Sequence, residues 1–144
     1  MKKIILLLGA ILMFFPALVT SQSNDASSAQ IEIKVLTDKL VYSPGEIVIM
    51  KLEAKNVGST PVQLMFPTSQ RFDFVVIYNG REVWRWSADK AFLQVIGYEY
   101  LKPGQFLEYK VAEYKAEKPA GVYNLIGILT SKPAYKGETT FKVE

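Results

Sequence analysis

Apolar and polar residues alternate along most of the chain after residue 30. From Ile31 to Leu36, isoleucine and valine alternate with charged residues, and the stretch from Ile47 to Val57 repeats this period of two. Such a period is typical of a β-strand with one buried face, because successive side chains point to opposite faces of a sheet. Strands are predicted in this way at residues 31–36, 47–57, 62–66, 71–78, 82–87, 92–100, 106–114, 121–130 and 138–143.

Turn-forming residues separate these stretches, and no segment has a convincing helical period. Asn79-Gly80 lies between two strand-like runs, and both residues accept the positive φ of a two-residue hairpin turn. Short strands at this spacing indicate a sandwich or a barrel. We therefore predict an all-β protein, an immunoglobulin-like antiparallel β-sandwich of about eight or nine strands over residues 31–144.

Both tryptophans, Trp84 and Trp86, lie on the return strand of this predicted hairpin. They are two residues apart and face the same side, where core packing is the simpler explanation and an exposed contact patch is the alternative. A two-residue turn pairs Tyr78 with Arg81 and Val76 with Val83.

Arg85 faces the opposite side, between the tryptophans. The same register places it across from Phe74, on which it can stack, and near Asp73, with which it can form an ion pair. Contact with a partner is the functional alternative for Arg85. For Asp73, a structural or surface role is favoured over acid–base catalysis.

The first 21 residues have the layout of a secretory signal peptide. Lys2 and Lys3 precede an uncharged apolar run, and small residues end the segment. Cleavage is predicted after Ser21, with cleavage after Ala29 as the alternative.

A polar linker is predicted over residues 22–30, before the folded domain. The signal places the protein outside the cytoplasm, secreted or in the cell envelope. An uncleaved signal that anchors the chain in a membrane is the alternative, and it is the only membrane contact predicted.

The residue inventory argues against an enzyme. The chain contains no histidine and no cysteine, which excludes Ser-His-Asp and Cys-His nucleophiles and thiolate or imidazole zinc sites. It has no glycine-rich phosphate loop or calcium loop, so no catalytic residue, cofactor or metal is predicted. The 17 basic and 14 acidic residues are interspersed, which gives no basic patch for nucleic acid. We expect a monomer that binds a protein.

Several segments resemble the BsuPI family, the intracellular proteinase inhibitors of Bacillus type. They are the run SQRFDFVV, the strand VWRWS, Phe92 with Gln94, the turn LKPGQ and the run PAGVY. The resemblance covers about residues 31–133. It implies a sandwich domain that inhibits serine proteinases. The family's namesake is intracellular, whereas this chain begins with a signal-like segment.

An inhibitor needs an exposed, preorganised segment that enters the proteinase cleft. Candidate segments are residues 68–71, 102–105, 115–120 and 131–137. The candidate contact residues are Arg71, Arg85, Lys132, Tyr135 and Lys136. The alternative function is a non-inhibitory, immunoglobulin-like interaction module of the cell envelope.

Overall fold

The structure, a computed structural model, describes residues 30–144. The predicted signal peptide and nearly all of the linker lie outside this range. The described elements are β1 (Ile31–Thr37), β2 (Val41–Tyr42), β3 (Ile47–Asn56), β4 (Val62–Phe66), β5 (Phe72–Tyr78), β6 (Arg81–Arg85), the 3₁₀ helix η1 (Trp86–Asp89), β7 (Gly97–Leu101), β8 (Phe106–Lys115), β9 (Gly121–Leu129) and β10 (Tyr135–Val143).

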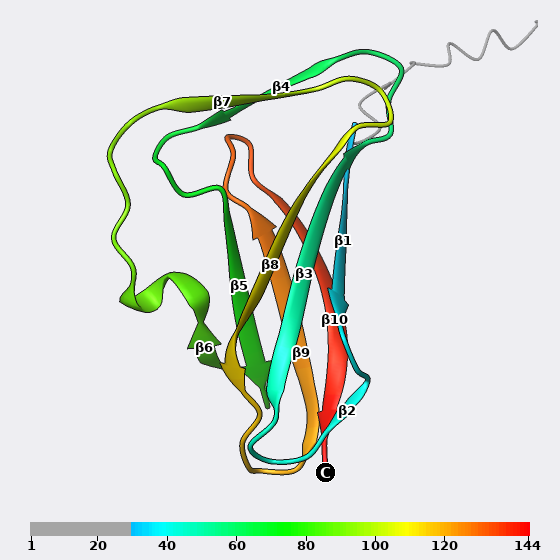
Figure 1. Cartoon of the computed structure of the whole chain (residues 1–144), viewed down its shortest axis with the longest axis vertical. Helices are drawn as coiled ribbons and strands as arrows, with labels where there is room; N and C mark the ends of the chain where they lie inside the picture. The colour runs from blue at the N-terminus through cyan, green and yellow to red at the C-terminus, as the bar shows by residue number, and fades with distance from the viewer. Residues whose placement is uncertain (1–29) are drawn as a thin grey trace, which may run out of the picture.

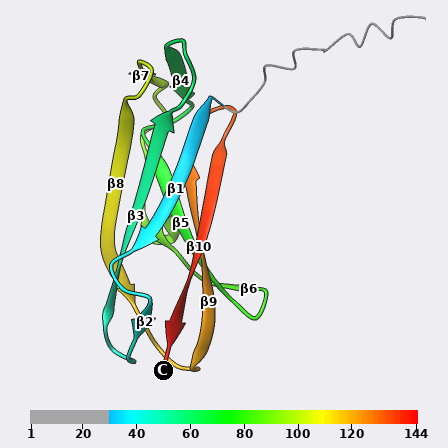
Figure 2. The ribbon, with the colours of Figure 1, turned by 90° about the vertical axis from the view of Figure 1, so that its right-hand side faces the viewer.

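The strands form two packed sheets and a small ribbon. One sheet has the order β1-β3-β8 and the other has the order β2-β10-β9-β5-β6. They lie face to face, and the β4–β7 ribbon crosses one end of the sandwich (Figure 1). Seen from the side, the two layers are separate and the β5–β6 hairpin projects from the sandwich (Figure 2). The predicted β-sandwich is confirmed, with ten strands in the described range and one parallel pairing, between β2 and β10.

The alternating pattern gives the core. Val48, Met50 and Leu52 of β3 are completely buried, as the period of two requires. They pack between the sheets with large aromatic side chains that include Phe74 and Phe141. Trp84 and Trp86 are only partly buried. Both pack against the edge of this core, which agrees with the structural reading of the two tryptophans.

The Asn79-Gly80 turn has the predicted form. Asn79 has φ 50° and Gly80 has φ 74°, the left-handed conformation that a two-residue hairpin turn uses. Tyr78 pairs with Arg81 as predicted.

Beyond the turn, the register of the hairpin differs from the prediction. An irregularity between Val76 and Ile77 places Trp84 opposite Val76, and Arg85 follows opposite Val75. The predicted pairs Val76–Val83 and Phe74–Arg85 are therefore wrong, because an extra residue shifts all later pairs by one. The sequence contains no signal for this bulge.

The chain after β6 also differs from the prediction. The expected strand over residues 92–100 is wrong in its first half, because regular pairing begins only at Gly97. Residues 90–96 have no regular secondary structure. Among residues 30–144, no helix has the length and apolar character needed to cross a membrane.

Candidate protein-contact segment

Residues 90–96, which we call the strap, connect η1 to β7. The strap runs outside the sandwich, from beside β6 to the ribbon at the far end (Figure 1). Its aliphatic side chains point to solvent: Leu93 is 70% exposed, Val95 61% and Ile96 60%. Three exposed large aliphatic side chains within four residues are unusual on a surface away from binding sites. Contacts at its two ends and at its centre hold this segment in place.

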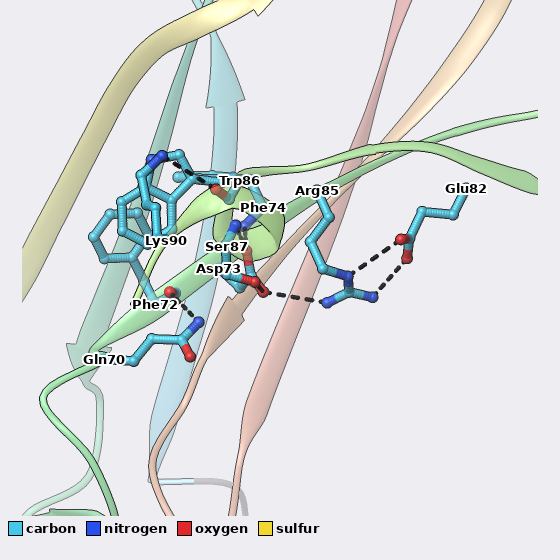
Figure 3. Close-up of polar contacts among 9 residues, drawn as sticks. All are labelled: Gln70, Phe72, Asp73, Phe74, Glu82, Arg85, Trp86, Ser87 and Lys90. Atoms are coloured by element: carbon cyan, nitrogen blue, oxygen red, sulfur yellow. Dashed lines mark hydrogen bonds and ion pairs between the residues drawn. The ribbon is translucent and has the colours of Figure 1, made fainter. Parts of the chain in front are cut away.

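The buried carboxylate of Asp73, which is only 4% exposed, anchors η1, the element directly before the strap. Its Oδ2 accepts hydrogen bonds from Arg85 Nη1 at 3.2 Å and from Ser87 Oγ at 2.5 Å. Its Oδ1 accepts the backbone N–H groups of Phe74 at 2.9 Å and Ser87 at 3.1 Å. These contacts fix the start of η1 against β5 (Figure 3).

Trp86 joins η1 to the opposite sheet. Its ring stacks on Phe72, with centroids 4.3 Å apart, and its indole Nε1 donates to Glu113 Oε1 at 3.0 Å. Lys90 Nζ donates to Glu113 Oε2 at 2.8 Å and lies 4.6 Å from the centre of the Trp86 ring. Since Glu113 belongs to β8, the first strap residue is held against both sheets.

The centre of the strap is pinned at Leu93. The Ser69 N–H donates to the Leu93 carbonyl at 2.9 Å, and the Leu93 N–H donates to Ser69 Oγ at 2.9 Å. Both backbone groups of Leu93 therefore face the β4–β5 connection, while its side chain faces solvent.

Arg71 holds the far end. Its Nε pairs with Glu99 Oε1 at 3.3 Å, and Nη1 donates to the Thr68 carbonyl at 3.0 Å. The guanidinium group also covers the Phe66 ring, 4.6 Å from its centre. A Cβ at Gly97 would overlap this guanidinium group, so glycine permits the close approach.

The stretch Gln94–Ile96 lies between these anchors. Its backbone groups pair with no other backbone group of residues 30–144. A short exposed stretch with free N–H and C=O groups, fixed on both sides, has the form of a segment that a partner recognises by main-chain pairing.

The predicted contact residues fall into two groups. Arg71 and Arg85 both have intramolecular ion-pair partners: Glu99 for Arg71, and Asp73 and Glu82 for Arg85. The ion pair of Arg85 with Asp73 is the one considered from the sequence. Arg71 thus packs against Gly97 at the end of the strap, and Arg85 supports Asp73, which holds the start of η1. The strap is not among the segments predicted from the sequence.

The other group, Lys132, Tyr135 and Lys136, lies in or beside the β9–β10 connection. Lys132 and Lys136 are exposed, whereas Tyr135 is partly buried against the core. The Lys132 N–H donates to the Met65 carbonyl at 2.8 Å, and Ser131 Oγ donates to the Pro133 carbonyl at 2.9 Å. This hairpin is a second fixed segment, of basic character. Within residues 30–144, no group of three or more acidic residues is placed to hold a metal ion.

The hydrogen bonds of Glu113 are expected to stabilise the structure less at acid pH. Hydrogen bonds from Lys90 and then Trp86 hold the pKa of Glu113 below its ordinary value of 4.5. A lowered pKa gives a stabilisation that is complete above the ordinary value and is lost as the pH falls through the lowered one. We expect the fluorescence of Trp86 to change over this acid range, and we expect Glu113→Gln to reduce the change. Identical pH profiles for the two proteins would contradict this role of Glu113.

Comparisons with known proteins place the chain in a family. The model of the BsuPI family, described as intracellular proteinase inhibitor, matches residues 35–134. This confirms the resemblance found in the sequence, and no curated protein sequence matches the chain. The described location contradicts the predicted secreted, cell-envelope or membrane-anchored location. That prediction depends only on the charge and apolar composition of the first residues, and it is wrong.

One solved structure shares the fold, and a second has a lower TM-score. The sporulation control protein Spo0M from Bacillus subtilis is 16% identical, with a TM-score of 0.52 over 80% of this chain. This chain spans 49% of Spo0M, about half its length. The CARDB domain of the PF1109 protein from Pyrococcus furiosus is 13% identical, with a TM-score of 0.43 over 79% of this chain and 87% of that one. At this identity, the likeness to Spo0M shows the fold alone.

Proposed function

Because the chain belongs to the BsuPI family of intracellular proteinase inhibitors, we propose that it inhibits a proteinase of serine type and that the strap is the segment that enters the proteinase. It acts by binding and has no catalytic activity of its own. The absence of histidine and cysteine supports this view, since the common nucleophile systems need one of them.

The observation that carries the proposal is the pinning of the strap. Ser69 holds Leu93 through two hydrogen bonds, and the anchors at Asp73, Glu113 and Arg71 fix the ends. A segment that is already ordered in its bound form loses little conformational entropy on binding, which is a main source of affinity in tight inhibitors. The chain has no disulfide, and these contacts supply the order that a disulfide would otherwise give.

A matched pair of serine variants separates the strap from the β9–β10 hairpin. Ser69→Ala removes the hydrogen bond that the Leu93 N–H donates to Ser69 Oγ. Such a bond stabilises the ordered strap by about 1 kcal/mol. We expect the inhibition constant for a sensitive serine proteinase to rise about fivefold. Ser131→Ala removes the corresponding bond to Pro133 in the hairpin and is expected to leave inhibition unchanged.

The measurement is the inhibition constant of the full chain and of both variants, with chemical unfolding as the check on folding. A rise for Ser131→Ala with none for Ser69→Ala would assign inhibition to the hairpin. Inhibition of none of a broad panel of serine proteinases, with the chain degraded as a substrate, would refute the proposed function itself.

A non-inhibitory interaction module is the second candidate, and one observation favours it. Ile96, Tyr98 and Tyr100 alternate along β7 and the residue before it, and all three are exposed. Tyrosines on an open sheet face are typical of protein interfaces. For such a module, Tyr98→Ala/Tyr100→Ala abolishes binding to a partner that is not a proteinase.

A further inference from the structure

We propose that the strap selects proteinases with apolar subsites, and that Val95 and Ile96 occupy them while the free backbone of Gln94–Ile96 pairs with the enzyme. This inference rests on the proposed function and adds the class of proteinase and the residues that it contacts.

The backbone supports this placement. Both backbone groups of Leu93 form hydrogen bonds with Ser69. The pairing of β7 with β4 begins at Gly97. The backbone of Gln94, Val95 and Ile96 is left unpaired between these two fixed points. An extended chain bound to a partner by main-chain hydrogen bonds presents its side chains to pockets in that partner. These three residues are therefore the part of the strap that a cleft can pair with.

The side chains define the chemistry of those pockets. Val95 and Ile96 are each about 60% exposed, so burying them in a partner removes a large apolar area from water. Residues 91–101 contain no lysine or arginine, and their single charged residue, Glu99, is paired with Arg71. Lys90, the one basic residue of the strap, is paired with Asp89 and Glu113, so the strap offers no free positive charge to an acidic pocket.

The β9–β10 hairpin has the opposite chemistry. Lys132 and Lys136 are exposed, and neither has an acidic partner among the ion pairs of residues 30–144. A proteinase with an acidic specificity pocket would fit this hairpin rather than the strap. The two segments therefore predict different classes of target.

The test compares enzymes whose specificity pockets differ. Chymotrypsin has an apolar pocket, elastase a small apolar one, and trypsin an acidic one; subtilisin is included as an unrelated serine proteinase. The full chain is assayed against all four, together with Val95→Asp/Ile96→Asp and with the matched control Lys132→Asp/Lys136→Asp. Both pairs are exposed, and chemical unfolding checks that each variant folds.

We expect at least one enzyme other than trypsin to be inhibited about 100-fold more strongly than trypsin. The strap variant is expected to lose about 100-fold in inhibition, because a carboxylate is strongly disfavoured in an apolar pocket, and the hairpin control is expected to change less than about twofold. Preferential inhibition of trypsin, lost in the hairpin variant and kept in the strap variant, would overturn the inference and leave the proposed function standing. Inhibition of none of the four would count against both.

Discussion

Asp73→Ala is expected to lower the free energy of unfolding by about 3 kcal/mol. Removing one partner of a buried ion pair typically costs about 3–5 kcal/mol. Asp73 is almost fully buried, while the Arg85 side chain is 37% exposed, so water can solvate the arginine left behind and the lower end of the range applies. The backbone N–H groups of Phe74 and Ser87 also lose their acceptor, and the start of η1 is released.

Chemical unfolding of wild type and variant measures this loss. Glu82→Gln is the matched control, since Glu82 is an exposed partner of the same arginine and exposed pairs contribute about 0–1 kcal/mol. The inhibition constant of Asp73→Ala should rise as well, because the strap loses an anchor. Equal losses of stability for the two variants would show that Asp73 is not the organising group.

Trp86→Ala is expected to lower the free energy of unfolding by about 2 kcal/mol. Fully buried aromatic residues lose about 3–5 kcal/mol on truncation, and Trp86 is only partly buried. The variant loses the stack on Phe72, the hydrogen bond to Glu113 and the ring beneath Lys90. The hydrogen bond from the indole to Glu113, which links η1 to β8, is then lost.

Trp86→Phe separates the ring from its N–H group. Phenylalanine can keep a stack on Phe72 but cannot donate to Glu113, so we expect a loss of about 1 kcal/mol. Unfolding free energies and inhibition constants of both variants are the measurements. If Trp86→Ala left inhibition at the wild-type value, η1 would not be an anchor of the binding segment.

Much of the fold could be predicted because burial follows a simple period in this chain. The alternation in residues 47–57 gives β3 and its buried side chains, and Asn79-Gly80 gives the turn of the β5–β6 hairpin. The bulge beyond that turn could not be predicted, since no glycine or other local signal marks Val83 as the extra residue. The β2–β10 pairing joins two residues to the far end of the chain, and no local pattern indicates it.

The candidate site was predicted less well than the fold. Arg71 and Arg85 were singled out as candidate contacts, and the structure gives each an ion-pair partner from a distant part of the chain. The signal for the strap is present in the sequence as Leu93, Val95 and Ile96 within a run without regular alternation. The sequence predicts a strand there, because apolar residues in an extended segment suggest burial until their neighbours are known.

Amide hydrogen exchange of the full chain, free and bound to an inactivated serine proteinase that it inhibits, tests the central claim most directly. In the free protein, the amides of Gln94, Val95 and Ile96 have no backbone partner and should exchange rapidly. Binding through the strap predicts strong protection of these amides and little change at Lys132 and Lys136. Protection confined to the β9–β10 hairpin, with the strap still exchanging rapidly, would contradict the account.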